Sequence, residues 1–249
     1  MSKNCEIHHL YHSGCSIEID NSLLVFDYYL DSANERSIEQ GVISAAKLKS
    51  KDQVYVFVSH SHQDHFNPVI FDWERYNSNT KYILSSDVPA KEKNNYYSLN
   101  KYEELRLDNL YLKSYGTTDQ GVSFLVEIAD FTIYHSGDLN WWHWKKFSPA
   151  ERKQEEKEFK EELAKLAGKE IDIAFVPVDP RLEEHFYLAG EYFAQKIQPQ
   201  LIVPIHFRDN YHITTEFADK IKHLSSATAQ ITKKGEKILF DKHSKDLED

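Results

Sequence analysis

The chain opens with short apolar runs separated by polar residues, and this pattern predicts strands. Asp20-Asn21 supplies a tight turn inside the series. A polar segment and a helix over residues 38–48 are expected before an apolar run that predicts a fully buried strand. The four expected strands are residues 7–11, 16–19, 23–26 and 54–58.

The rest of the chain predicts a second set of strands and several helices. Pro68 favours a helix start after Asn67, and Ser148-Pro149-Ala150-Glu151 is a capping box that opens a helix ending at Gly168. Strands and helices then alternate, and the last two strands are expected to pair with each other. The expected strands are residues 82–84, 110–115, 122–128, 131–135, 173–176, 201–205, 229–232 and 237–240, and the later helices are 189–197 and 215–224.

Composition limits the classes of protein to consider. The 249 residues are 41% hydrophobic, which is enough for a core, and no linker divides them, so we expect an α/β chain with a single domain over residues 1–249. A net charge of -10 argues against nucleic acid as a partner. Without a signal peptide or a membrane-length apolar run, we expect a cytoplasmic protein with no membrane partner.

A dense group of metal-ligand residues follows the buried strand at 54–58. The segment Ser59-His60-Ser61-His62-Gln63-Asp64-His65 holds four such side chains within six residues. Imidazole and carboxylate together suit zinc, iron or manganese, so the ligand types alone do not fix the ion. Asp138 and His206 each follow another apolar strand and would lie at a sheet edge, where they are the expected partners of this segment.

The order of these motifs resembles the metallo-β-lactamase fold superfamily, in particular its lactonase-like and phosphodiesterase-like cytoplasmic branch. Asp27 matches the first motif, residues 60–65 the second, Asp138 the fourth and His206 the fifth. The resemblance covers nearly the whole chain. It implies a four-layer αββα sandwich of two mixed sheets, with a metal site at one edge.

The resemblance also implies how the ligands divide between two ions. His60 and His62 would hold the first metal, Asp138 would bridge, and the second metal would be held by Asp64, His65 and His206. The histidine of the third motif is missing, and the corresponding stretch contains Thr117-Thr118-Asp119. Asp119 or a water is the preferred substitute, and tight binding of only one ion is the alternative.

Several further residues are candidates for the surroundings of the site. Asp27 is expected to hydrogen-bond and orient the histidine segment rather than bind metal. His12 resembles a histidine at the pocket mouth, or is an ordinary polar residue at a strand end. His185 would face the pocket or be a solvated loop residue. The indoles of Trp141, Trp142 and Trp144 are expected in the core, with Trp141 or Trp142 near the site.

The resemblance implies hydrolysis by a metal-held hydroxide, with Asp64 orienting the hydroxide and moving its proton. His62 stands where the flavodiiron oxygen reductases carry Glu, which argues against oxygen reduction. We expect one or two ions, zinc first and Mn²⁺ or Fe otherwise, and an ester-type bond in a small molecule: a lactone, a carboxylic ester or a phosphodiester. The alternatives are a non-catalytic metal-binding module and, ranked lower, a nuclease. The sequence does not indicate an oligomeric state.

Overall fold

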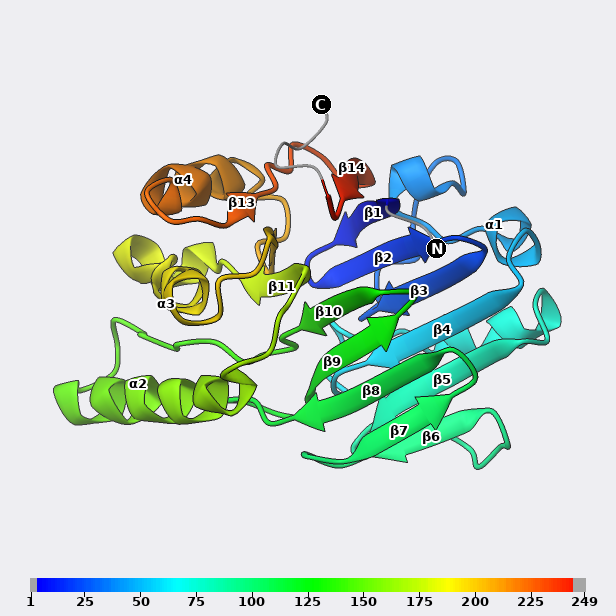
Figure 1. The fold of residues 1–249 in the computed structure, drawn as a ribbon, viewed down its shortest axis with the longest axis horizontal. Helices are drawn as coiled ribbons and strands as arrows, with labels where there is room; N and C mark the ends of the chain where they lie inside the picture. The colour runs from blue at the N-terminus through cyan, green and yellow to red at the C-terminus, as the bar shows by residue number, and fades with distance from the viewer. Residues whose placement is uncertain (1–3, 244–249) are drawn as a thin grey trace. The chain divides into compact units, whose positions relative to one another are not determined.

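The computed structural model describes residues 4–243, which form two compact units. The first unit contains residues 4–100 and 232–243, and the second contains residues 101–231. Each unit is built on a seven-stranded mixed sheet (Figure 1). The predicted α/β class with two mixed sheets is therefore confirmed, whereas the assignment of the whole chain to one domain stays a prediction.

The sheet of the first unit has one antiparallel half and one parallel half. Its strand order is β14-β1-β2-β3-β4-β5-β6, and the strands from β3 to β6 run parallel. β1 pairs antiparallel with β2, and β2 pairs antiparallel with β3, so β1 and β3 point the same way. The strands are β1 (Asn4–Tyr11), β2 (Gly14–Ile19), β3 (Ser22–Phe26), β4 (Gln53–Val58), β5 (Thr80–Ser85), β6 (Tyr96–Leu99) and β14 (Glu236–Asp241).

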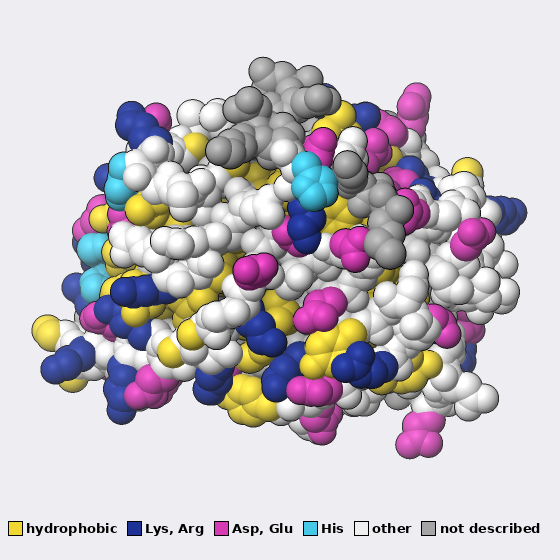
Figure 2. Space-filling model, viewed as in Figure 1, with side chains coloured by type: hydrophobic (Ala, Val, Ile, Leu, Met, Phe, Trp, Pro, Cys, Tyr) yellow, Lys and Arg dark blue, Asp and Glu magenta, His cyan; other side chains and the backbone are white. Residues whose placement is uncertain are grey.

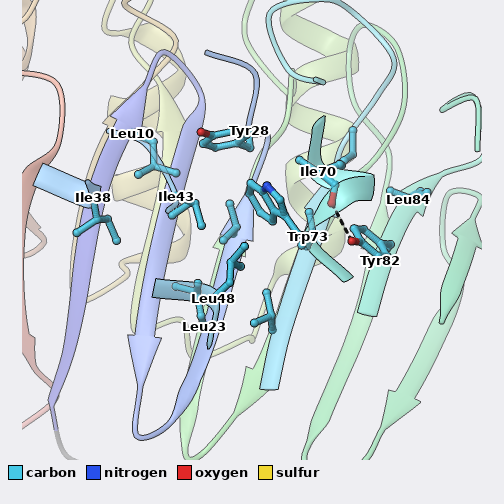
Figure 3. Close-up of a cluster of buried hydrophobic side chains, with 14 of the residues drawn as sticks. Leu10, Leu23, Tyr28, Ile38, Ile43, Leu48, Ile70, Trp73, Tyr82 and Leu84 are labelled. Atoms are coloured by element: carbon cyan, nitrogen blue, oxygen red, sulfur yellow. Dashed lines mark hydrogen bonds between the residues drawn. The ribbon is translucent and has the colours of Figure 1, made fainter. Parts of the chain in front are cut away.

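Three short helices belong to the first unit: η1 (Ile38–Gln40), α1 (Ala45–Lys49) and η2 (Pro68–Arg75). Their apolar side chains and those of the sheet form one buried cluster (Figure 3). Trp73 of η2 is 2% exposed, and the Tyr82 hydroxyl on β5 donates to the Ile70 carbonyl at 2.7 Å. Truncating a buried indole such as Trp73 typically costs about 3–5 kcal/mol, so η2 is firmly held against its sheet.

The sheet of the second unit has the order β13-β12-β11-β10-β9-β8-β7. β10, β11, β12 and β13 run parallel, and β10, β9, β8 and β7 pair antiparallel. The strands are β7 (Glu104–Leu107), β8 (Leu110–Tyr115), β9 (Ser123–Ile128), β10 (Phe131–His135), β11 (Ile173–Pro177), β12 (Leu201–Ile205) and β13 (Ala227–Thr228).

The helices of the second unit start with α2, where the predicted capping box is confirmed: the Ser148 hydroxyl accepts from the Glu151 N–H, and the Glu151 carboxylate accepts from the Ser148 N–H. Phe193 of α3 stacks on Tyr134 of β10 with ring centroids 5.4 Å apart, which fixes α3 on the sheet. The helices are α2 (Pro149–Leu163), η3 (Ala164–Leu166), η4 (Pro180–His185), α3 (Leu188–Ile197) and α4 (His212–Ile221).

Two predicted elements are wrong. The helix expected over residues 38–48 is split into η1 and α1, because Gly41 takes a left-handed φ of 67° that ends the first turn. The expected pairing of the last two strands does not form. Residues 229–232 are not a strand, β14 pairs with β1, and β13 pairs with β12.

On the face shown in Figure 2, basic side chains are interspersed with acidic ones. Within residues 4–243, every helix is too short or too polar to span a bilayer.

Candidate metal centre

The histidine segment lies at the carboxyl edge of the first unit's sheet. Asp27 directly follows β3, residues 59–65 follow β4, and Asp87 comes two residues after β5. Because these strands are parallel, their carboxyl ends meet at one edge. The Ser61 N–H donates to the Asp87 carboxylate at 2.8 Å, which ties the histidine segment to the next loop. The carboxyl ends of β1, β3 and β4 therefore bring six candidate residues to this edge: His12, Asp27, His60, His62, Asp64 and His65.

Asp27 is a fully buried carboxylate that organises the segment. One of its oxygens accepts from the Ser59 N–H at 2.7 Å, and the other accepts from the Ser59 hydroxyl at 2.7 Å and from His65 Nδ1 at 2.8 Å. Its own N–H donates to the Phe57 carbonyl at 2.9 Å, and its φ of 45° is unusual for a non-glycine residue. Such strain persists where the surrounding contacts fix the backbone, as these do.

The hydrogen bonds around Asp27 assign the tautomers of two histidines. A carboxylate can only accept, so His65 must carry its proton on Nδ1. The Ser59 hydroxyl spends its one proton on Asp27, so at 2.9 Å it accepts from His60 Nδ1. Both rings therefore keep the lone pair on Nε2. In metal-binding histidines, one ring nitrogen binds the metal while the other donates a hydrogen bond to a carboxylate or another acceptor.

His12 and Asp64 lie beside these rings. One ligand atom of each of His12, Asp64 and His65 lies within 4.8 Å of the others, and His12 Nε2 is 3.5 Å from the Asp64 carboxylate. The neighbouring His12 imidazole lowers the pKa of Asp64, so Asp64 is ionised at neutral pH. His62 is exposed, and its ring centroid is 4.6 Å from that of His60.

The second unit presents a separate pair of candidate ligands at the carboxyl ends of its own parallel strands. Asp138 follows β10, and His206 directly follows β12 with a left-handed φ of 70°. Both are buried, and His206 Nε2 is 3.4 Å from an Asp138 carboxylate oxygen. The sheet therefore brings these two predicted residues together.

Asp179 is a site residue that our sequence reasoning missed. It comes after β11, the strand between β10 and β12, and its buried carboxylate accepts from His206 Nδ1 at 3.1 Å. This bond leaves the His206 lone pair on Nε2, toward Asp138. Burial would raise the pKa of Asp179, but hydrogen bonds from His206 and Arg181 outweigh it and lower the pKa to about 2.

The loop that replaces the third-motif histidine lies next to Asp138. The Thr118 hydroxyl donates to the Asn140 carbonyl at 2.6 Å, and a carboxylate oxygen of Asp119 lies within 4.8 Å of one of Asp138. Asp119 is exposed, in contrast to Asp138. This position is compatible with the predicted role of Asp119 as a substitute oxygen ligand.

The remaining candidates of the second unit make other contacts. His185 lies against His143, with ring centroids 4.1 Å apart, and pairs with Glu184 at 3.7 Å. Trp142 meets the His206 ring edge-on at 5.7 Å, whereas Trp141 packs against aromatic rings of α2 and α3. Trp142 is therefore the indole at the candidate ligand.

Each unit's donors, taken by themselves, fit a divalent transition metal. In the first unit, His60 and His65 offer Nε2 lone pairs next to the ionised Asp64. In the second unit, His206 offers Nε2 beside the carboxylate of Asp138. Imidazole nitrogen with carboxylate oxygen is a donor set of zinc, iron and manganese sites, and nothing in it selects among these ions.

A cavity of about 640 Å³ lies in the first unit between η2 and the loop before β6. Its apolar wall consists of Phe66, which directly follows His65, and the stacked rings of Phe71 and Tyr96. Charged residues of η2 and of the loop before β6, including Arg75 and Lys91, form the rest of the lining. The size and the aromatic wall are typical of a site for a small organic ligand.

Comparisons with known proteins agree on the fold. No family model matches the sequence. The chain is 23% identical over 224 residues to a UPF0173 metal-dependent hydrolase of Staphylococcus saprophyticus, covering 81% of this chain and 87% of that protein.

Two solved structures resemble the chain over 95% of its length. Igni18, a metallo hydrolase from Ignicoccus hospitalis, superposes with a TM-score of 0.64 at 16% identity over 98% of its chain. The metallo-β-lactamase fold protein YhfI from Bacillus subtilis superposes with a TM-score of 0.61 at 9% identity over its full length. This chain therefore has the metallo-β-lactamase fold, as the order of its motifs predicted.

Proposed function

We propose that the protein is a metal-dependent hydrolase that cleaves an ester-type bond in a small molecule. The observation that carries the proposal is the hydrogen-bond network around Asp27. It fixes the protons of His60 and His65 on Nδ1, so that both Nε2 lone pairs are available to a metal ion. A buried network of this kind is what metal-binding histidines need. The similarity to proteins named metal-dependent hydrolase and metallo hydrolase supports the same assignment.

The proposed ligands are the six residues of the motif order: His60, His62, Asp64, His65, Asp138 and His206. We propose zinc as the ion, bound once or twice, with Mn²⁺ or Fe as alternatives. Asp119 would complete the set in place of the missing histidine. What supports this list is that the two groups, each within its own unit, hold imidazole and carboxylate donors at the carboxyl ends of parallel strands.

A bound ion would supply a water of lowered pKa as nucleophile and polarise the carbonyl or phosphoryl oxygen under attack. The chain's own contribution is acid–base work and orientation. Asp64 is ionised at neutral pH and partly exposed, so it can accept a proton from the attacking water. His12, at 3.5 Å, holds the carboxylate in place. Asp27 orients the histidines without touching substrate.

The substrate we propose is a lactone, another carboxylic ester or a phosphodiester with an apolar part. The cavity lined by Phe66, Phe71 and Tyr96 supports an aryl or acyl group, because these rings offer flat apolar surface. The net charge of -10 gives no support to nucleic acid as a substrate. A cytoplasmic location and a small-molecule partner belong to the same proposal.

The test is a substrate panel run with metal-loaded protein. 4-Nitrophenyl butyrate, a γ-lactone and bis(4-nitrophenyl) phosphate represent the three bond classes. We expect turnover of at least one probe, inhibition by a chelator, and a loss of at least 100-fold in kcat/KM in Asp64→Asn. Asp52→Asn is the matched control, because Asp52 is an exposed carboxylate just before β4, outside the cavity and the histidine segment.

Other outcomes would identify the alternatives. Metal binding without turnover of any probe would contradict the hydrolase and favour a binding module. Cleavage of RNA or DNA that depends on His62 would favour a nuclease. Equal activity in wild type and Asp64→Asn would refute the role given to Asp64.

A further inference from the structure

Asp179 receives most of its hydrogen bonds from a single residue, Arg181. The guanidinium Nε donates to both carboxylate oxygens at 3.0 Å, Nη2 donates to Oδ2 at 2.6 Å, and the backbone N–H donates to Oδ1 at 2.9 Å. Oδ2 also accepts from His206 Nδ1 at 3.1 Å. Asp179 is 1% exposed, so a carboxylate that lost these donors would be buried without compensation.

The Arg181 guanidinium carbon also lies over the Trp144 ring, 5.4 Å from its centroid. Trp144 stacks on Trp142 with an interplanar angle of 1°, and Trp142 meets the His206 ring edge-on. The contacts therefore form a closed ring of side chains, which runs from His206 through Asp179, Arg181, Trp144 and Trp142 back to His206. Three loops of one unit contribute to it: the segment after Asp138, the start of η4, and the end of β12.

We propose that Arg181 is a positioning residue for the metal ligand His206. It holds the Asp179 carboxylate in the orientation that accepts from His206 Nδ1, and it braces the indole stack that packs on the same imidazole. His206 is thereby kept in the Nδ1–H tautomer, with Nε2 directed at Asp138. This inference rests on the proposed function, because it concerns a ligand of the proposed metal centre.

A simple surface ion pair would not have these properties. Exposed pairs contribute about 0–1 kcal/mol, and Arg and Lys are often exchangeable in them. At Asp179 the acceptor is buried, and Nε and Nη2 engage it together as a fork, a geometry that a lysine ammonium cannot reproduce. Lysine would keep the charge and the backbone N–H bond but would lose the fork and the contact of the guanidinium with Trp144.

The test compares Arg181→Met and Arg181→Lys with Arg106→Met. Methionine keeps an apolar stem over Trp144, and Arg106 is the control because it is exposed and stacks on Tyr111 in the same unit. The first readout uses metal-free protein: ¹⁵N chemical shifts of the imidazole nitrogens, with His206 assigned by the signal lost in His206→Gln. We expect a single Nδ1–H tautomer in wild type and Arg106→Met, and a mixture in Arg181→Met.

The second readout is Zn²⁺ affinity by competition with a chromophoric chelator. We expect a loss of about 10–100-fold in Arg181→Met, partial recovery in Arg181→Lys, and wild-type affinity in Arg106→Met. Far-UV circular dichroism at the assay temperature checks that each variant is folded, and Arg181→Lys keeps the test valid if Arg181→Met unfolds.

Unchanged tautomer and unchanged affinity in folded Arg181→Met would overturn the inference. Failure of the proposed function gives a different result: wild type would then neither bind Zn²⁺ nor turn over a substrate, while the tautomer measurement would still report on Arg181.

Discussion

Replacing Asp27 with Asn is the sharpest perturbation that the structure offers, because the change removes one charge and almost no volume. If the amide oxygen keeps the bond from the Ser59 N–H, the amide nitrogen faces the Ser59 hydroxyl and His65 Nδ1, both of which now donate to Asp27. Donors would then face donors. The network can be satisfied again only if the protons move.

The rearrangement that restores these hydrogen bonds changes two histidines. The amide N–H groups would donate to His65 Nδ1 and to Ser59 Oγ, and the hydroxyl proton would turn to His60 Nδ1. Both rings would then carry their proton on Nε2, the atom proposed to bind metal. We therefore expect Asp27→Asn to bind Zn²⁺ at least about 10–100-fold more weakly than wild type.

The stability loss follows from the same count of bonds. Three hydrogen bonds to a carboxylate become bonds of a neutral amide, and each such change costs about 1 kcal/mol. A neutral amide is cheaper to bury, which offsets part of this cost. We expect the free energy of unfolding of the metal-free protein to fall by about 2–3 kcal/mol.

The assay combines urea unfolding in chelator, imidazole ¹⁵N shifts and Zn²⁺ competition. Asp72→Asn is the control, and since Asp72 is about half exposed and pairs with Arg75 on the surface, it should change stability by less than about 1 kcal/mol. The reasoning is refuted if Asp27→Asn keeps the Nδ1–H tautomers of His60 and His65, or keeps wild-type affinity for Zn²⁺.

Three further substitutions test other parts of the fold. Burial lowers the pKa of His9 from 6.5 to about 3, so His9 stays neutral in the folded state while the unfolded state takes up a proton below pH 6.5. Stability is therefore lost as the pH falls, by about 2 kcal/mol at pH 5, and urea unfolding at pH 7 and pH 5 should show a smaller loss in His9→Gln than in wild type. Ser148→Ala removes the N-cap of α2 and should cost about 1 kcal/mol by thermal unfolding; Ser50→Ala, at the C-terminal end of α1, should cost less. Gly41→Ala should cost about 2–3 kcal/mol, because Gly41 has a positive φ and a Cβ would lie 2.3 Å from the Leu10 carbonyl; an unchanged unfolding midpoint would contradict this account of the break between η1 and α1.

The sequence predicts the strand ends well, because apolar runs bounded by ligand residues are a local signal. Asp27, residues 59–65, Asp138 and His206 each directly follow or lie within three residues of the end of a strand that the pattern predicts. Their chemistry could be proposed on that basis alone. The same local signal is present at Asp179, which comes two residues after β11, but its bond with His206 Nδ1 depends on the folded structure.

Other features depend on contacts that no local pattern encodes. The partner of β14 is β1, more than 200 residues earlier in the chain, so the apolar runs near the C-terminus could not reveal it. The predicted helix over residues 38–48 is broken where Gly41 takes a left-handed φ, and the Leu10 carbonyl, from a distant segment, leaves no room there for a Cβ. The tautomers of His60 and His65 follow from Ser59 and Asp27 meeting in space, and only the structure supplies that meeting.

The central claim is that these histidines and carboxylates hold a metal ion. The most direct test is the metal content, by inductively coupled plasma mass spectrometry, of protein loaded with Zn²⁺ and freed of excess ion. We predict at least one equivalent in wild type and in His223→Ala, which removes an exposed histidine, and a loss of at least half of the bound metal in His206→Ala and in the double variant of His60 and His65 to Ala. Equal metal content in all four folded proteins would contradict the account.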